Sequence, residues 1–464
     1  MQRRIFGLET EYGMISSSPE GRVSLSVESA LGYLFEKVVG RQRGTNDFLC
    51  NGGRLYQDTG CHPEYATPEC DDPLELALFD KAGERIVEDL QLAAEQKLRD
   101  NGIDCDLFLF KNNTDSVGNT YGCHENYLVD RTVNFHKLAE LLIPFLVTRQ
   151  IFTGAGKVLK TRVGNHYCIS QRAQHIYQEI SGATTSSRGI INTRDEPHAD
   201  EERYRRLHVI VGDSNMSEVS TYLKVGITAL VLAMIEDGAC RKDLVLEDPV
   251  RAIKEISHDT SCTRTVRLRQ GTERSAVELQ REYLELAHAY YATLEPLPRV
   301  ADLLARWERV LDQLAADPAA CGREVDWVIK RELLQAYTTR KGIGFDDQRI
   351  SMLDLQYHDL RQDKGLYYRL EREGYVERLL GDDEIHRAMT VPPTDTRAYF
   401  RGTCLRKFPD QIAGASWSSI LLDTGEAAVK RLPMADPSRG TQKLVGEILE
   451  RSDSAAELME RLAG

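Results

Sequence analysis

The sequence predicts an α+β or mixed α/β protein with a large N-terminal domain and a small C-terminal one. Short segments with strand-like alternation, such as 106–110, are separated by long stretches with helical spacing, such as 74–100. A chain of 464 residues exceeds the roughly 300 residues at which a single hydrophobic core stops growing. A proline-containing segment at 391–395 interrupts the pattern, so we expect one domain over 1–395 and a second over 396–464.

The first predicted strand carries two acidic residues on one face. Alternate side chains of a strand point to the same side, so Glu9 and Glu11 share a face. An isolated pair of this kind is most often solvated. The opposite face, however, is apolar, with Phe6, Leu8 and Tyr12. This pattern predicts a strand that is covered on both sides.

A second acidic segment, 51–58, is also patterned like a strand. It places Arg54, Tyr56 and Asp58 on one face and leads into Glu64. Burying several carboxylates on one sheet face is costly unless cations compensate for the charge. Mg²⁺ prefers oxygen ligands and commonly accompanies phosphates. The two segments therefore predict a metal–nucleotide site.

The elements that follow the second segment are predicted from local signals. A helix is expected at 74–100, because apolar residues recur at helical spacing, the segment 71–73 provides a capped start and Gly102 ends it. A strand follows at 106–110. The next segment, 111–126, is too polar and too rich in glycine for a core element. We interpret it as a loop that lines the site.

Farther along, helices are predicted at 138–153 and 216–237, with a strand at 204–213. His208 lies in that strand, where a lone histidine is more often a hydrogen-bonded core residue than a ligand. Arg194 precedes the strand in a polar segment. It is interpreted either as a phosphate contact or as a surface salt-bridge residue.

Composition argues against several classes of function. The net charge of −13 disfavours general nucleic-acid binding. Ten cysteines without a Cys-x-x-Cys pair are expected to be mostly reduced core residues. The longest apolar stretch, Val225 to Ile235, is too short to span a bilayer, and Glu9 interrupts the N-terminus too early for a secretory signal. We therefore expect a cytoplasmic protein with neither a membrane nor a nucleic acid as partner.

Two common nucleotide-binding motifs are missing from the sequence. The segment 154–158 resembles a phosphate loop, but it lacks the upstream glycine and the Ser or Thr that should follow Lys157. No Gly-x-Gly-x-x-Gly follows a predicted strand, so the dinucleotide-binding fingerprint is absent. A nucleotide site in this protein must be built in another way.

Four segments together resemble the Pup ligase family, also called proteasome accessory factor A. They are Gly7–Gly13, Asn51–Cys70, Lys111–Tyr127 and Arg206–Met216. The resemblance implies a glutamine synthetase-like fold, in which a curved antiparallel sheet packed with helices holds ATP and Mg²⁺ on its concave face. It also implies a reaction. ATP phosphorylates the side-chain carboxylate of the C-terminal glutamate of Pup, a small ubiquitin-like modifier, and a target lysine then attacks the acyl phosphate to form an isopeptide bond.

The resemblance also implies roles for individual residues. Those expected to bind Mg²⁺ are Glu9, Tyr56 and Glu64, with Glu11 as a helper. Those expected to contact ATP are Arg54, Thr67 and Trp417. Thr67 has the opposite strand parity to Glu64, so its contact requires a strand end or a backbone group. Asp58 is the expected catalytic base, because a lysine ammonium must lose a proton before it can attack. The other interpretation is a structural or metal-orienting carboxylate.

Three other functions are compatible with a fold of this kind. The sister enzyme, a depupylase and Pup deamidase, has a long insertion between the two acidic segments, whereas here only the 37 residues from Met14 to Cys50 intervene, which favours ligation. A ligase for a small amine and a small glutamate-like acid requires a closed pocket instead of an open groove. A catalytically silent binding protein is disfavoured, because the chemically demanding site residues are intact.

The expected partners are Pup and lysine-bearing target proteins. Pup is expected to bind as a largely disordered acidic chain that folds on contact. We therefore predict a basic, partly apolar groove in spite of the acidic net charge. Its candidate residues, each equally consistent with a solvated surface position, are Arg203, Arg205, Arg206, Lys157, Lys160 and Arg162.

Overall fold

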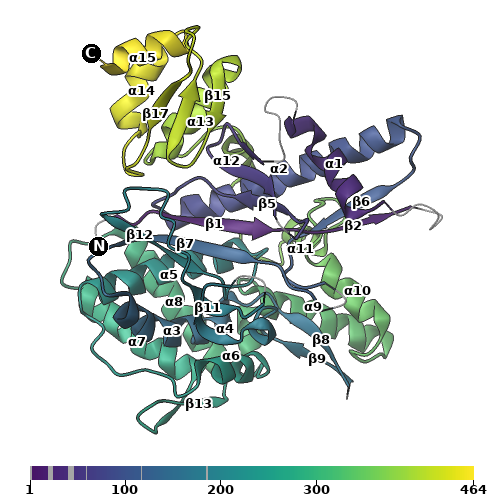
Figure 1. The fold of residues 1–464 in the computed structure, drawn as a ribbon. Coiled ribbons are helices and arrows are strands. Elements are labelled where there is room, and N and C mark those ends of the chain that lie inside the picture. The colour runs from purple at the N-terminus through teal and green to yellow at the C-terminus, as the bar shows by residue number, and fades with distance from the viewer. Residues whose placement is uncertain are drawn as a thin grey trace.

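An eight-stranded sheet forms the centre of the protein (Figure 1). The computed structural model describes residues 3–18, 25–39, 46–58, 60–115, 118–162, 164–183 and 186–463, so positions 116 and 117 of the predicted site loop lie outside the described residues. From one edge to the other, the strands are β10 (Gln178–Ser181), β11 (Gly189–Asn192), β12 (Tyr204–Val209), β7 (Cys123–Asp130), β1 (Phe6–Glu11), β5 (Pro63–Ala66), β4 (Arg54–Gln57) and β3 (Asn46–Phe48).

The sheet is antiparallel at every pair of neighbouring strands except one. β10 and β11 are parallel, with Gln178 opposite Gly189 and Ser181 opposite Asn192. The sheet is thus mixed, whereas the expected sheet was antiparallel. The exception lies at the edge of the sheet, away from the acidic strands β1, β5 and β4.

Helices cover the apolar face of the sheet. The helix predicted at 74–100 is confirmed as α2 (Pro73–Asp100), whose start is capped by the Asp72 carboxylate as it accepts hydrogen bonds from the Leu74 and Glu75 N–H groups. In Figure 1, further helices gather below the sheet. They are α3 (Phe135–Thr148), α5 (Glu218–Glu236), α7 (Ala276–Tyr291) and α8 (Pro298–Ala316). Their buried side chains form one large hydrophobic cluster with those of β1 and β7.

Two predicted elements differ from the structure in their extent. The last four residues of the predicted loop 111–126 belong to β7, where the buried carboxylate of Glu125 faces the helical core. The predicted helix 138–153 is divided into α3 and a short helix α4 (Gln150–Thr153). At the break, Arg149 donates a 2.8 Å hydrogen bond to Glu125. A buried ion pair of this kind depends on tertiary contacts that local sequence signals do not report.

Among the described residues, α5 is the one helix that is long and apolar enough to cross a membrane by length and composition, with a hydropathy of 1.5 over its most apolar window. However, 94% of that window is buried inside the protein. The helix packs against α2, α3, α7 and α8. It is therefore the central core helix of the main part of the fold.

The C-terminal residues form a small unit, drawn in yellow-green at the top of Figure 1. It consists of α13 (Arg397–Lys407), β15 (Ile412–Ala415), β16 (Ser419–Leu422), β17 (Lys430–Pro433), α14 (Gln442–Arg451) and α15 (Ala455–Ala463). A separate hydrophobic cluster, which includes Phe400, Ile420 and Leu449, lies inside it. This separate core supports the proposed domain boundary at residue 395.

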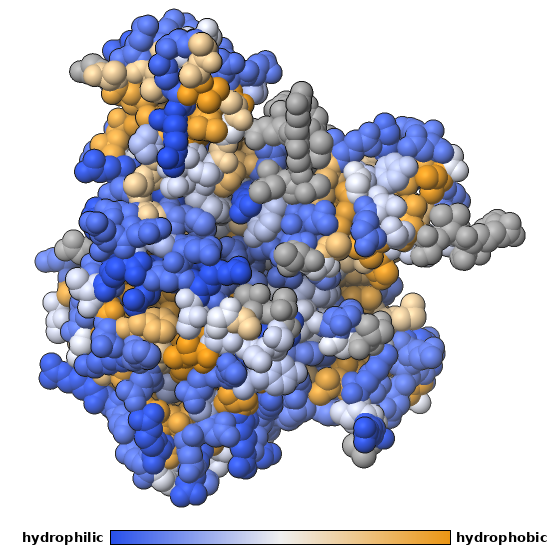
Figure 2. Space-filling model, viewed as in Figure 1, coloured by the Kyte–Doolittle hydropathy of each residue, from blue (hydrophilic) through white to orange (hydrophobic). Residues whose placement is uncertain are grey.

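Smaller elements complete the fold. They are β2 (Gly13–Ser17) paired with β6 (Asp106–Phe110), β8 (Lys157–Thr161) paired with β9 (Gly164–Cys168), β13 (Thr265–Arg267) paired with β14 (Glu273–Ser275), and the helices α1 (Val27–Val39), α6 (Pro249–Ser257), α9 (Asp326–Lys341), α10 (Gln348–Gln356), α11 (Leu366–Arg372) and α12 (Asp382–Ala388). Figure 2 shows that hydrophilic side chains cover most of the visible face, with apolar ones in scattered patches, as is usual for a protein surface.

Candidate active site

Carboxylates from neighbouring strands meet on the sheet face opposite the helical core. Glu11 of β1 is the direct cross-strand partner of Glu64 of β5, which in turn lies opposite Tyr56 of β4. Directly opposed residues of antiparallel strands point to the same side, and so does Glu9, two residues from Glu11. Glu11 and Glu64 are only 7% and 3% exposed. The structure therefore brings together the residues expected to bind Mg²⁺ and the expected helper.

The crowding of negative charge changes the protonation of Glu64. Burial, followed by the charges of Glu9 and Glu11, raises the pKa of Glu64 well above its usual value. The Tyr56 hydroxyl is hydrogen-bonded to the same carboxylate. These groups form a compact set of oxygen donors with excess negative charge. That donor set fits Mg²⁺, which takes oxygen ligands and would relieve the repulsion.

Glu9 also lies beside two histidines. The ligand atoms of Glu9, His124 and His208 lie within 4.8 Å of one another, so these side chains could also hold a metal ion. Burial, followed by the charge of His124, lowers the pKa of His208 to about 3, so its imidazole is neutral at pH 7. His208 is 3% exposed and its Nδ1 lies 2.8 Å from Asn126 Oδ1, as expected of a core histidine. Its side chain nevertheless lies beside Glu9 in the site.

Sequence reasoning did not identify His124 as a site residue. It lies directly opposite Glu9 across β1 and β7, and its Nδ1 is 3.5 Å from Glu9 Oε2. Burial opposes ionisation of Glu9, but the hydrogen bond with His124 and nearby positive charges lower the pKa of Glu9 below its usual value. The signal that would have identified His124 is the register between the two strands, which sequence alternation alone does not provide.

Asp58, the expected catalytic base, lies just beyond the end of β4. Its Oδ2 accepts a 3.1 Å hydrogen bond from the Gly60 N–H, and its own N–H donates to the His62 carbonyl at 3.0 Å. Its negative charge contributes to the raised pKa of Glu64, which shows that it is close to the acidic group. Gly60 and His62 line a large cavity. Asp58 therefore lies between the acidic face and that cavity.

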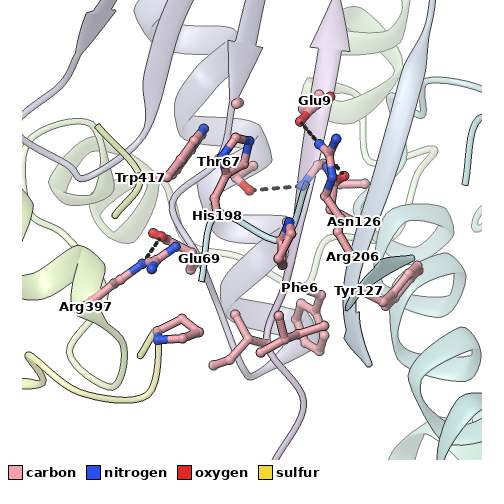
Figure 3. A pocket seen from close by; sticks show the side chains of 17 residues that line it. Phe6, Glu9, Thr67, Glu69, Asn126, Tyr127, His198, Arg206, Arg397 and Trp417 are labelled. Carbon is pink, nitrogen blue, oxygen red and sulfur yellow. Dashed lines mark hydrogen bonds and ion pairs between the residues drawn. The ribbon is translucent and has the colours of Figure 1, made fainter. Parts of the chain in front are cut away.

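Glu9 also lines a second, smaller cavity (Figure 3). Thr67 and Trp417, two of the residues expected to contact ATP, both line it. Thr67 follows the last residue of β5, as its strand parity required, and its Oγ1 accepts a 3.1 Å hydrogen bond from the Leu8 N–H. Arg206, a candidate for the modifier groove, lies here instead, with Nη1 3.7 Å from Glu9 Oε1.

Arg54, the third residue expected to contact ATP, does not line this cavity. Its guanidinium stacks over the ring of Tyr56 at 4.2 Å and lies 5.8 Å from the ring centre of Phe48. Phe48 in turn meets Trp417 edge to face, with ring centres 4.9 Å apart. Arg54 is therefore connected to the cavity through aromatic side chains.

The larger cavity accounts for part of the predicted basic groove. Lys157 and Lys160 line it. Arg203 and Arg205 lie elsewhere and are engaged by Asp436 at 3.7 Å and Asp195 at 3.3 Å, respectively. The predicted groove residues thus do not line one cavity, because β8 belongs to the two-stranded sheet with β9 whereas β12 lies in the central sheet.

Two remaining candidates are exposed. Arg162 lies at the tip of the β8–β9 hairpin, outside the lining of either cavity. Arg194 is also exposed, and its backbone N–H donates a 2.8 Å hydrogen bond to the side chain of Asn192. Neither position lies within the acidic group, so the surface interpretation of Arg194 fits the structure better than a phosphate contact.

An acidic sheet face with two cavities beside it is an arrangement that fits an enzyme that brings two substrates together. The family model described as Pup-ligase protein matches residues 4–421. The chain therefore belongs to the Pup ligase family. It is 52% identical over 452 residues to the Pup–protein ligase of Actinosynnema mirum, a match that covers 97% of this chain and 99% of that relative. It is 50% identical to the Pup–protein ligase of a Nocardioides species, over 97% of this chain and 100% of the relative.

Solved structures agree with the family assignment. The protein is similar to PafA in its crystal structure with the prokaryotic ubiquitin-like protein Pup, with a TM-score of 0.89 and 37% identity over 99% of this chain and 94% of that chain. It is also similar to PafA in complex with ADP, with a TM-score of 0.81 and 38% identity over 92% of this chain and 94% of that chain. These matches confirm the family resemblance and the α+β fold class expected from the sequence.

Proposed function

We propose that this protein is an ATP-dependent ligase that joins Pup to lysines of target proteins and so marks them for the proteasome. The observation that carries the proposal is the acidic face of Glu9, Glu11 and Glu64 beside Asp58, in a chain of the Pup ligase family. Related PafA structures contain Pup and ADP, which are the modifier and the nucleotide product that such a reaction requires.

The nucleotide is assigned to the smaller cavity, with its phosphates toward Glu9. Thr67 and Trp417 would contact it there, and Arg54 would reach it from the stack on Tyr56. Glu9, Tyr56 and Glu64 would hold Mg²⁺, because they are neighbouring oxygen donors and the crowded carboxylates raise the pKa of Glu64. When bound, the cation would neutralise charge on the transferring phosphoryl group.

The reaction has two steps. In the first, the side-chain carboxylate of the C-terminal glutamate of Pup attacks the γ-phosphorus of ATP, and ADP leaves. In the second, the amine nitrogen of a target lysine attacks the acyl carbon, and inorganic phosphate leaves as the isopeptide bond forms. Asp58 would accept the proton from the lysine ammonium. Its position between the acidic face and the larger cavity supports this role.

The larger cavity is the proposed entry for the C-terminal segment of Pup. It adjoins the turn that holds Asp58, and Lys157 and Lys160 offer positive charge to an acidic chain. We place the reaction in the cytoplasm, where the ten free cysteines, eight of them buried, would stay reduced.

The depupylase and Pup deamidase is the second candidate, because it would use the same fold and aspartate. The segment between the two acidic strands favours the ligase. It has only 37 residues from Met14 to Cys50, and α1 occupies 13 of them. The relatives at about half identity are also named Pup–protein ligases.

The deciding experiment combines the purified protein with ATP, Mg²⁺, a Pup that ends in glutamate and a lysine-bearing protein. Intact mass spectrometry should show a conjugate, with one ADP formed for each isopeptide bond. A matched reaction with a preformed conjugate and no free Pup tests the reverse activity. Cleavage of that conjugate without any ligation would move the protein to the depupylase class.

A further inference from the structure

One buried arginine of the C-terminal unit connects the parts of the proposed site. Arg401 of α13 is 0% exposed. It donates to the Gly52 carbonyl from Nη2 at 2.8 Å and from Nε at 3.3 Å, and to the Trp417 carbonyl at 3.2 Å. It also donates to both carboxylate oxygens of Glu69. A guanidinium has five N–H groups, so these five hydrogen bonds use all of them.

The partners of Arg401 lie on three separate segments of the site. Gly52 lies two residues before β4, which carries Arg54 and Tyr56 and leads to Asp58. Glu69 lies three residues after the end of β5 and two residues after Thr67. Trp417 lies in the turn between β15 and β16 of the C-terminal unit. Arg401 therefore fixes the position of the C-terminal unit relative to β4 and β5.

Aromatic side chains extend this connection as far as the acidic face. The Arg401 guanidinium lies 4.9 Å from the ring centre of Trp417 and 5.1 Å from that of Phe48. Phe48 also contacts Arg54, which stacks on Tyr56 at 4.2 Å. A continuous series of cation–aromatic contacts thus runs from Arg401 to a proposed metal ligand.

The approach of α13 to the β4 turn is close. A Cβ added at Gly402 would lie 2.5 Å from the Cys50 carbonyl oxygen. A Cβ added at Gly52, where φ is +85°, would lie 3.0 Å from Ala398. Helix α13 therefore packs directly against the turn before β4. No gap between the helix and the turn would allow Arg401 to shift.

We propose that Arg401 is a positioning residue that holds Trp417 at the nucleotide cavity and thereby sets the affinity for ATP. This inference rests on the proposed function, because it requires Trp417 to contact the nucleotide. Arg401 does not line the cavity, whereas Trp417 and Glu69 do. A lysine at this position would keep a positive charge beside Glu69, but it lacks the planar fork that reaches Gly52 and Trp417 together.

The test compares wild type with R401K, R401M and a control in the same helix, K407M. Lys407 donates to the carbonyls of Leu449 and Glu450 at 2.6 and 2.9 Å, so its loss weakens the C-terminal unit without reaching the sheet. Calorimetry gives the Kd for ADP, and the conjugation assay gives the KM for ATP and kcat. Circular dichroism identifies the folded variants, and R401K, which keeps the buried charge, decides the test if R401M does not fold.

We expect R401K and R401M to raise the Kd for ADP and the KM for ATP by about tenfold, which corresponds to about 1.4 kcal/mol. We expect kcat to stay within about threefold of wild type, because the reacting groups are untouched. K407M should leave all three quantities unchanged. Wild-type values for R401K, or an equal loss of nucleotide affinity in K407M, would overturn the proposal.

A double-mutant cycle then asks whether Arg401 acts through Trp417. If it does, the R401K/W417A variant should bind ADP no more weakly than W417A alone, because the side chain being positioned is already missing. If the two substitutions weakened ADP binding additively, Arg401 would not act through Trp417. If the proposed function is wrong, wild type itself will form no conjugate. The ADP affinities of the variants can still be compared in that case, so the two failures are distinguishable.

Discussion

Glu11 and Glu64 face each other across β1 and β5, and both side chains are almost fully buried. Like charges in directly opposed positions destabilise a sheet, and burial makes the repulsion stronger. The pair is therefore costly in the free protein, and a divalent cation would relieve it. Part of the stability of this fold is expected to depend on the bound metal.

Replacement of Glu64 with glutamine tests this dependence. In the presence of EDTA, we expect E64Q to be more stable than wild type by about 1 kcal/mol, because the side chain at this position no longer has to take up a proton when it is buried beside Glu9 and Glu11. The same variant should require at least roughly tenfold more Mg²⁺ for ADP formation. Thermal unfolding with and without Mg²⁺, together with a Mg²⁺ titration of activity, measures both effects. Equal stabilisation of both proteins by Mg²⁺ would argue against a role for Glu64 as a ligand.

Replacement of Asp58 with asparagine separates catalysis from binding. We expect D58N to bind ADP and Mg²⁺ as wild type does, while isopeptide formation falls by about 10²–10⁴-fold, the usual contribution of a general base. Calorimetry and single-turnover conjugation provide the two measurements, and E64Q is the matched contrast because it should lose metal affinity. If D58N also lost nucleotide binding, Asp58 would be reassigned to the metal site.

Charge reversal at Lys160 tests the proposed entry of Pup. Lys160 lines the larger cavity, so K160E should weaken Pup binding by roughly fivefold, as expected for about 1 kcal/mol of lost attraction, and more at low salt. R205E is the control, because Arg205 pairs with Asp195 and stacks on Phe135 away from the cavity. Fluorescence anisotropy with labelled Pup gives both affinities. A larger effect in R205E would place the groove along β12 instead.

Glu69 predicts a dependence of stability on acidic pH. Although burial opposes its ionisation, the charges of Arg401 and Arg397 lower the pKa of Glu69 to about 2. A glutamate in an unfolded chain has a pKa of about 4.3. The ion pairs therefore stabilise the fold fully above that pH, by about 3 kcal/mol, and this contribution is lost as the pH falls toward 2.

E69Q should accordingly be less stable than wild type at pH 7, and the difference should narrow between pH 4 and pH 2. Urea unfolding at several pH values measures the difference. A difference that stays constant with pH would show that packing, rather than charge, is what the substitution removes.

Two helical glycines should respond in opposite directions to alanine. A Cβ at Gly83 of α2 would lie 2.3 Å from the ring of Tyr65, so G83A should lower stability by about 1–3 kcal/mol through overpacking. Gly32 of α1 has no atom within 4 Å of such a Cβ, so G32A should raise stability by up to about 1 kcal/mol through helix propensity. Thermal unfolding distinguishes the two. Stabilisation by both substitutions would mean that α2 can move away from the sheet.

Much of the site could be predicted from the sequence, because strand alternation is a local property. It placed Glu9 and Glu11 on one face, grouped Arg54 with Tyr56, and required Thr67 to lie at a strand end, as the structure shows. Helix caps were equally readable, as Asp72 demonstrates. The prediction of one basic groove was less successful, because the sequence around the arginines of β12 does not indicate which side chains they contact.

The sequence by itself determined the α+β class, the two acidic strands, the family resemblance and the candidate residues, since these depend on residue type and on short-range periodicity. Only the tertiary structure decided the cross-strand pairing of Glu11 with Glu64, the place of His124 beside Glu9 and the contacts of Arg401. The physical reason is that register and domain packing minimise the energy of the whole chain. Which residues distant in sequence come into contact therefore depends on the fold of the whole chain and not on local sequence.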